Sequence, residues 1–197
     1  MEKLVNTSKN IHDKIFSKMT RHLDRASIKK VIDAGSGKIS ASILLKYFPN
    51  AELDAIIYPG DNRKKNPLEN AIGSDRLNVI EADICHTTFR KHYEFCLVHL
   101  SLGEARHFDN SFEDLFHNIM QIKASYFLII DIFEDPCVHF RYLEQYIKEK
   151  DFTILKKKKF KNPKPEHYPK VKIDKYKLEF DSKHFMAYLI KNDSMDK

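Results

Sequence analysis

The stretch VIDAGSGKIS, residues 31–40, decides the fold of this chain. Residues 30–34 form a short apolar run that predicts a buried strand, and Gly35 and Gly37 follow it directly. Apolar residues at helical spacing resume over residues 39–48. A buried strand, a glycine-rich turn and a helix in this order are typical of the first unit of a parallel α/β sheet.

Outward from this unit, strand patterns and helix patterns alternate along the chain. Further strands are predicted at 52–58, 76–81, 94–100 and 126–132, and helices at 8–24, 111–123 and 138–149, with a helix or turn at 65–73. Ser8 is the expected cap of the first of these helices. The tail differs, because two predicted strands, 153–160 and 184–190, flank a lysine-rich connection.

The pattern predicts a doubly wound α/β domain of Rossmann type. Its central strands are near-continuous apolar runs, as expected for a mostly parallel sheet covered by helices on both faces. A length of 197 residues with 42% apolar residues suits a single domain over residues 1–197 with a sizeable core. Within it we expect an N-terminal helix over 8–24, a ligand-binding core over 30–150 and a C-terminal strand pair over 151–190.

Composition excludes several other classes of protein. Three cysteines without short spacing exclude a disulfide framework and a CxxC site, and Cys96 is expected to be a buried thiol. The ten histidines form no metal-binding pattern, so no metal is expected. No signal peptide and no apolar run of about 18–20 residues is present, which predicts a cytoplasmic protein without a membrane span. The net charge of +6 favours acidic partners but does not identify one.

Three interpretations compete for the glycine-rich turn. A phosphate-binding P-loop requires GxxxxGK[ST], but Ile32 occupies the first glycine position and Ile39 the hydroxyl position. A dinucleotide fingerprint requires GxGxxG, but its third glycine is replaced by Ser40. The third interpretation begins with an acid at the end of the strand, Asp33, two residues before Gly35.

With that acid, VIDAGSGKIS resembles the first motif of class I S-adenosylmethionine-dependent methyltransferases, although Ile39 replaces the third glycine of the usual pattern. In this family the turn wraps the methionine part of S-adenosylmethionine, and the acid positions its amino group. The resemblance therefore implies that Asp33, Gly35, Ser36 and Gly37 bind the cofactor.

Two later segments continue the resemblance in the same order. AELDAIIYPGD, residues 51–61, resembles the second strand, but Ile57 stands where the family has an acid that binds the ribose hydroxyls. Asp61 and Tyr58 are the nearby residues expected to contact the ribose. LNVIEADI, residues 77–84, resembles the third motif, which implies that Asp83 receives the adenine amino group and that Ile84 packs on the ring.

The last matching segments are YEFCLVHLSLGEARHF, residues 93–108, and YFLIIDIFEDP, residues 126–136. The first places His99 at the end of the fourth strand, where it is a candidate cofactor contact and general base. Ser101, Glu104, Arg106 and His107 follow in the same loop, where Glu104 and Arg106 are candidates to orient an acceptor. Asp131, Glu134 and Asp135 close the fifth strand, where they either bind a substrate cation or cap the next helix.

Over residues 30–190 the resemblance implies a Rossmann-like, mostly parallel seven-stranded sheet with an antiparallel C-terminal strand. It implies transfer of a methyl group from S-adenosylmethionine to an acceptor by in-line displacement, with S-adenosylhomocysteine as the product. The acceptor is open between a small molecule and RNA, and the oligomeric state is open as well. The alternatives are a non-catalytic module that binds S-adenosylmethionine or RNA and, less favoured, a nicotinamide-dependent oxidoreductase.

Residues 156–177 contain ten lysines with interleaved aromatic residues. This pattern fits a surface that neutralises phosphates and stacks on bases, as nucleic-acid-binding proteins do. The preferred interpretation is an exposed edge strand that lysines protect from aggregation.

Overall fold

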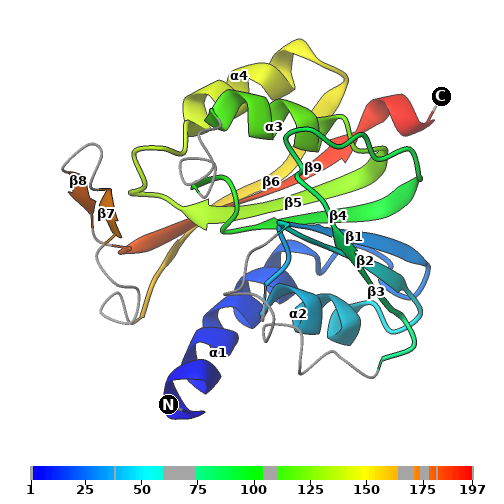
Figure 1. Ribbon diagram of the computed structural model, residues 1–197, viewed down its shortest axis with the longest axis horizontal. Helices are drawn as coiled ribbons and strands as arrows, with labels where there is room; N and C mark the ends of the chain where they lie inside the picture. Colours follow the sequence, from blue (N-terminus) through cyan, green and yellow to red (C-terminus); the bar gives the residue numbers. More distant parts are fainter. Residues whose placement is uncertain are drawn as a thin grey trace.

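The computed structural model describes residues 2–37, 39–59, 74–103, 111–163, 171–173, 178–180 and 182–196. Seven of its strands form one sheet in the order β3-β2-β1-β4-β5-β9-β6 (Figure 1). These strands are β1 (Lys30–Ala34), β2 (Glu52–Ile57), β3 (Leu77–Glu81), β4 (Tyr93–His99), β5 (Ala124–Ile132), β6 (Phe152–Lys161) and β9 (His184–Asn192). The order reverses between β1 and β4, and ligands of such sheets bind at this switch point.

Neighbouring strands from β3 to β5 are parallel, whereas β9 runs antiparallel to both β5 and β6. The last long strand of the sequence therefore lies between two strands that precede it. Its residues Phe185 to Ile190 are all buried, because helices cover both faces of the sheet at this place.

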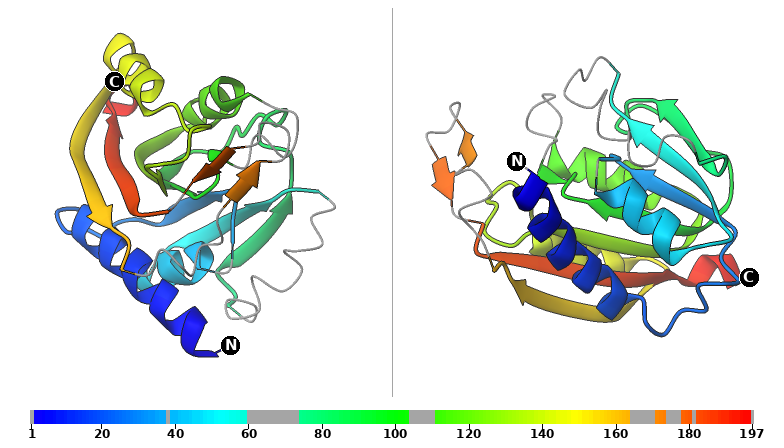
Figure 2. Two further views of the ribbon diagram at one scale, coloured as in Figure 1. Left: turned by 90° about the vertical axis from the view of Figure 1, so that its left-hand side faces the viewer. Right: turned by 90° about the horizontal axis from the view of Figure 1, so that it is seen from below.

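Helices lie on both faces of the sheet, as Figures 1 and 2 show. On one face lie α1 (Glu2–Met19) and α2 (Ser40–Tyr47), and on the other lie α3 (Phe112–Met120) and α4 (Phe140–Glu149). A short 3-10 helix, η4 (Asp193–Asp196), follows β9. Alternation of side chains along the strands fills two apolar layers, one under each helix pair.

The fold predicted from the sequence is confirmed, including the seven-stranded, mostly parallel sheet and its antiparallel C-terminal strand. Every strand predicted before residue 164 is present, with ends displaced by at most two residues. The predicted helix at 8–24 was wrong at both ends, because α1 begins at Glu2 and ends at Met19. Ser8 lies inside this helix and is not its cap. The segment predicted as a helix or turn at 65–73 lies outside the described residues.

The lysine-rich connection contains two short strands that the sequence did not predict. β7 (Val171–Ile173) and β8 (Leu178–Phe180) pair antiparallel in a sheet of their own. This pair lies beyond the end of the main sheet toward which β5 points (Figure 1). No helix in the described part of the chain is long and apolar enough to cross a membrane.

Candidate functional site

The turn after β1 is held by hydrogen bonds from its own polar groups. The Ser36 hydroxyl donates to Asp33 Oδ2 at 2.6 Å, and both side chains are fully buried. The Ser36 backbone N–H donates to the carbonyl of Ile56 on β2 at 2.6 Å. The buried carboxylate is therefore tied into the turn, and the turn is tied to the neighbouring strand.

The two glycines of this turn serve different purposes. Gly35 has φ of +84°, and a Cβ there would collide with the Ser101 hydroxyl and lie 2.8 Å from the Ser101 Cβ. Gly35 is thus required by the chain itself. Among the described residues, a Cβ at Gly37 would meet no atom within 4 Å, and the φ of Gly37 is not in the left-handed region. The fold alone therefore does not require glycine at position 37.

The end of β4 packs against this turn through Ser101. Its hydroxyl lies 3.2 Å from the carbonyl oxygen of Gly35 and 3.0 Å from that of His99, and it donates toward both. Leu100, between His99 and Ser101, has φ of +54°, a conformation that residues with a side chain rarely adopt. Strained backbone of this kind is concentrated at functional sites of proteins.

Asp131, at the end of β5, fixes the same loop from the other side. Its Oδ2 accepts the Leu102 backbone N–H at 3.0 Å, and its Oδ1 accepts that of Ile132 at 2.8 Å. Burial raises the pKa of Asp131 to about 7, and the nearby Asp135 carboxylate adds to the rise, while the backbone donors oppose it. Both oxygens of Asp131 thus accept backbone hydrogen bonds, one of which positions the β4 loop.

The other two acids after β5 are also bound within the chain. Glu134 accepts the backbone N–H of His184 at 2.9 Å, and its second oxygen lies 2.6 Å from His184 Nδ1. Asp135 accepts the Cys137 backbone N–H at 2.9 Å. The predicted capping of the next helix is wrong, because the N-cap residue of α4, His139, has no side-chain hydrogen bond and no acid stands in the first turn of that helix. Glu134 and Asp135 instead hold the backbone of β9 and of the turn before α4.

His99 makes a contact that the sequence did not indicate. Its Nε2 lies 2.9 Å from Nδ1 of His12 on α1, and the two rings meet edge to face. The His12 ring also contacts Phe185 on β9, and both histidines are buried. The pair therefore joins α1 to the carboxyl end of β4.

Burial keeps both histidines neutral. Burial lowers the pKa of His99 to about 4, and burial followed by the proximity of His99 lowers the pKa of His12 well below 6.5. One ring nitrogen in the contact must donate and the other accept. The signal for His12 was present in the sequence, since a histidine stands beside Ile11 in the apolar pattern of the N-terminal helix.

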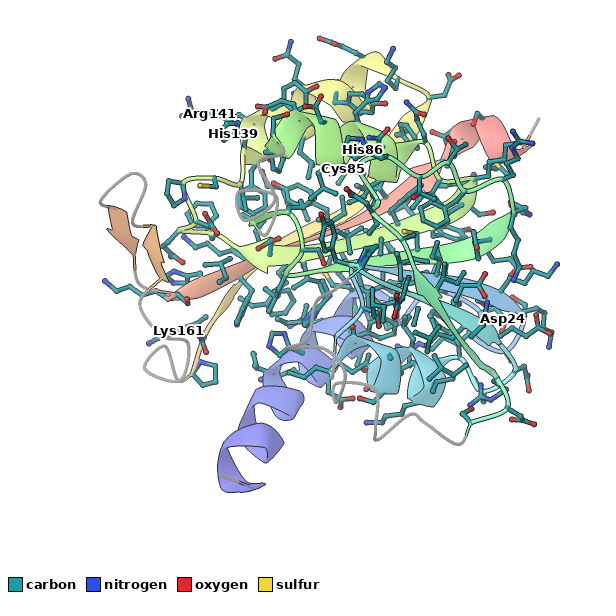
Figure 3. All side chains as sticks on the ribbon, in the orientation of Figure 1. Asp24, Cys85, His86, His139, Arg141 and Lys161 are labelled. Carbon is teal, nitrogen blue, oxygen red and sulfur yellow. The ribbon has the colours of Figure 1, made fainter. Side chains whose placement is uncertain are left out.

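The carboxyl ends of β2 and β3 lie beside the turn after β1, on the side opposite to β4. Ile57 ends β2 and is half-buried, and Tyr58 follows it. After β3, Asp83 Oδ1 accepts the Cys85 backbone N–H at 2.9 Å, while the Asp83 side chain stays 22% exposed. Ile84 packs into the apolar layer under α3 and α4. Figure 3 shows Cys85 and His86 near α3.

The structure thus brings most of the predicted site residues to one edge of the sheet. Asp33, Gly35, Ser36, Gly37 and His99 lie at the adjacent ends of β1 and β4. Tyr58 follows β2, one strand spacing or about 5 Å from β1, whereas Asp83 and Ile84 follow β3, two spacings or about 10 Å from β1. Asp61, Glu104, Arg106 and His107 lie outside the described residues. Sequence reasoning missed His12 and the role of Asp131 as a support for the β4 loop.

The comparisons with known proteins identify the fold. No protein-family model matches the chain, and no curated protein sequence matches it. Among solved structures, the chain is similar to the N-methyltransferase NodS of Bradyrhizobium japonicum in complex with S-adenosyl-L-homocysteine. The TM-score is 0.66 at 9% identity, over 94% of this chain and 87% of that one.

Two further structures have the same fold. A putative RNA methyltransferase, PH1948 of Pyrococcus horikoshii, matches with a TM-score of 0.60 at 14% identity, over 92% of this chain and 84% of that chain. The StiE O-MT structure matches with a TM-score of 0.62 at 15% identity, over 93% of this chain and 74% of that chain. The resemblance to class I S-adenosylmethionine-dependent methyltransferases is confirmed at the level of the fold.

Proposed function

We propose that this chain is a methyltransferase that binds S-adenosylmethionine at the carboxyl ends of β1 to β4. The observation that carries the proposal is the turn after β1. It combines a buried acid, a glycine that the fold requires and a glycine that the fold does not require. A proposed role for Gly37 is to let the backbone approach a ligand closely, since no atom of the described residues occupies the space of a side chain there.

The residues at this edge fit the cofactor at most of its contacts. Asp33, Gly35, Ser36 and Gly37 would hold the methionine part, and Asp83 with Ile84 would hold the adenine. Asp83 keeps an exposed side-chain fraction with which to accept a hydrogen bond. The ribose end fits less well, because Ile57 offers no hydrogen-bond acceptor. Tyr58 and Asp61 are the proposed replacements.

When bound, the cofactor supplies an electrophilic methyl group, so the chain has mainly to position the acceptor and exclude water. His99 is the proposed catalytic residue. With a pKa of about 4 it is a weak base, so we expect it to accept a proton only after the new bond has made the acceptor acidic. Its contact with His12 would orient the ring and support the charge that forms.

The acceptor class is proposed from the solved structures that share the fold of this chain. The similar structures include an N-methyltransferase and a putative RNA methyltransferase, which supports a small molecule or RNA as the acceptor. The missing acid at Ile57 supports the second candidate function, a module that binds the cofactor or RNA without turnover.

Calorimetric titration with S-adenosylmethionine and S-adenosylhomocysteine tests the proposal, with NAD and ATP as controls. We expect dissociation constants of about 1–100 μM for the first two ligands. The variant Gly37→Ala should keep its melting temperature and lose at least about tenfold in affinity, or about 1.4 kcal/mol. Binding of NAD or ATP alone, or unchanged affinity in Gly37→Ala, would contradict the assigned site.

A turnover assay separates the two candidate functions. With tritiated methyl groups on the cofactor, label should pass to RNA or to a small-molecule fraction in wild type. We expect His99→Gln to retain cofactor binding and to lose about 10²-fold or more in the rate of transfer. Tight binding without transfer to any fraction would favour the non-catalytic module.

A further inference from the structure

The lysines of β6 are divided between the two faces of the sheet. Lys156 points to the face of α1, where its Nζ donates to the Lys18 carbonyl at 2.6 Å. Lys157 points to the opposite face, where its Nζ lies 2.6 Å from Glu144 Oε1 on α4. Alternation places Lys158 with Lys156, while Lys159 lies on the opposite face with its Nζ 3.5 Å from the centre of the Phe133 ring.

The end of α1 adds two more cations to the first of these faces. Contact with Lys158 and the proximity of Arg21 lower the pKa of Lys18. Burial, followed by the proximity of Arg21 and Lys18, lowers the pKa of Lys156. Lys18, Arg21, Lys156 and Lys158 thus lie close enough to repel one another. We call these four residues the α1–β6 basic patch.

The basic patch has no acidic counterpart in the part of the chain that the structure describes. Lys46 pairs with Asp13 and Lys157 with Glu144, but none of the four patch residues has a carboxylate within 4.0 Å there. Protection of an edge strand explains lysines on β6. It does not explain Lys18 and Arg21, which belong to α1 and the turn after it.

One member of the patch, Lys158, is level with the proposed catalytic edge, whereas Lys156 is level with Leu97 in the middle of β4. Lys158 pairs with Ala187, Ala187 with Ile130, and Ile130 with His99 across the sheet. Three strand spacings separate β6 from β4, or about 14 Å. β6 continues to Lys161, which lies at the end of the molecule near β7 and β8, whereas Asp24 lies at the opposite end (Figure 3). A flexible strand of a few nucleotides spans such a distance.

We propose that the α1–β6 basic patch binds the phosphates of a single-stranded RNA acceptor and so presents a nucleotide to the carboxyl end of β4. This inference rests on the proposed methyltransferase function and names its acceptor class. Four cations spread over α1, the turn after it and β6 fit a chain of regularly spaced negative charges. The cations of α1 and of the turn are exposed, and those of β6 are half-buried. A small anion would engage only part of the patch. Lys156 and Lys158, but not Lys157 and Lys159, are the lysines of β6 that take part.

Fluorescence anisotropy with a labelled single-stranded RNA of about 12 nucleotides tests the proposal without any cofactor. The decisive variants are Lys156→Gln/Lys158→Gln and the matched control Lys157→Gln/Lys159→Gln, which removes the same charge from the opposite face. Each phosphate contact contributes about 0.7 to the slope of log affinity against log salt concentration. We expect the first pair to lower the slope by about 1.4 and, with the affinity at the 1 M reference unchanged, to weaken binding about 25-fold at about 0.1 M salt.

The control pair should bind within about twofold of wild type. Lys18→Gln/Arg21→Gln should weaken binding as the first pair does. Equal losses in both β6 pairs, no loss in the first pair, or tighter binding of DNA of the same sequence would overturn the proposal. Because the assay omits S-adenosylmethionine, RNA binding that follows the patch while calorimetry finds no cofactor binding would uphold the patch and reject the methyltransferase function.

Discussion

At the residue scale, Gly35 and Gly37 provide the clearest contrast in the molecule. Gly35 combines φ of +84° with a side-chain position that Ser101 already fills. Gly37 has neither constraint. The fold requires glycine at position 35, whereas at position 37 only a bound ligand would require it.

Gly35→Ala is expected to destabilise the protein by about 3 kcal/mol, because it adds both backbone strain and a steric clash. Gly37→Ala is expected to change the free energy of unfolding by less than about 0.5 kcal/mol. Urea unfolding of the two variants against wild type measures both values. A loss in Gly37→Ala as large as that in Gly35→Ala would contradict the distinction.

The His12–His99 pair makes stability depend on pH. The folded-state pKa of His99, about 4, lies below its unfolded value of about 6.5. The unfolded state therefore binds more protons on acidification, so the stability is complete above pH 6.5 and is lost as pH falls toward 4. From about pH 7.5 to pH 5 we expect a loss of about 2 kcal/mol from His99 alone.

Urea unfolding at the two pH values checks this loss. The matched variant is His99→Gln, whose side chain can hydrogen-bond with His12 but does not titrate. It should lose about 2 kcal/mol less than wild type over the same interval. The same acid sensitivity in both proteins would show that His99 is not held neutral by the fold.

Sequence reasoning reached the residues of the turn because glycine and aspartate carry local signals at the end of a strand. It could not find the contact of His12 with His99, because 87 positions separate them and only the packing of α1 on the sheet brings them together. Sequence reasoning also missed the role of Asp131, because 29 positions separate it from Leu102 and only the pairing of β4 with β5 brings the two together.

At the scale of elements, Asp54 ties three strands together. This buried carboxylate accepts hydrogen bonds from Tyr93 Oη at 2.7 Å, Lys91 Nζ at 2.9 Å and Asn78 Nδ2 at 3.1 Å. Its partners come from β3, from β4 and from the turn before β4. Although burial would raise it, these three partners lower the pKa of Asp54.

Asp54→Ala is expected to cost about 2 kcal/mol of unfolding free energy, because it leaves the buried Tyr93 hydroxyl unpaired and also removes the hydrogen bonds from Lys91 and Asn78. Tyr93→Phe, which removes one of the three bonds, is expected to cost about 1 kcal/mol. Thermal and urea unfolding of both variants provide the comparison. Equal losses would show that the network does not act through Asp54.

The elements themselves were predictable because long apolar runs and helical spacing are strong local signals. The residues at which the elements begin and end were less predictable. The end of α1 at Met19 depends on the turn that follows, in which Thr20 Oγ1 donates back to the Phe16 carbonyl at 2.9 Å. β7 and β8 were missed because each has only three residues in a segment dominated by lysine.

At the scale of the whole molecule, the sheet is complete only when β9 is in place between β5 and β6. The pairing of β9 with both of these strands is antiparallel. Apolar patterning predicted the strand, and the resemblance to a known family predicted its direction. Periodicity alone does not determine the order of strands in a sheet.

A chain that ends at Lys183 therefore lacks a central strand of the sheet. We expect it to fail to fold cooperatively, because Phe185 to Ile190 form part of both apolar layers. Circular dichroism and thermal unfolding of the shortened chain measure this. A cooperative transition near that of the full chain would contradict the placement of β9.

A crystal structure of the protein with S-adenosylhomocysteine tests the proposed cofactor site most directly. We expect the amino-acid part of the ligand to lie on the backbone of Gly35 to Gly37 with its amino group facing Asp33. We expect the adenine to lie between Asp83 and Ile84. A ligand bound elsewhere, or crystals grown at saturating ligand that show none at the ends of β1 and β3, would contradict the central claim.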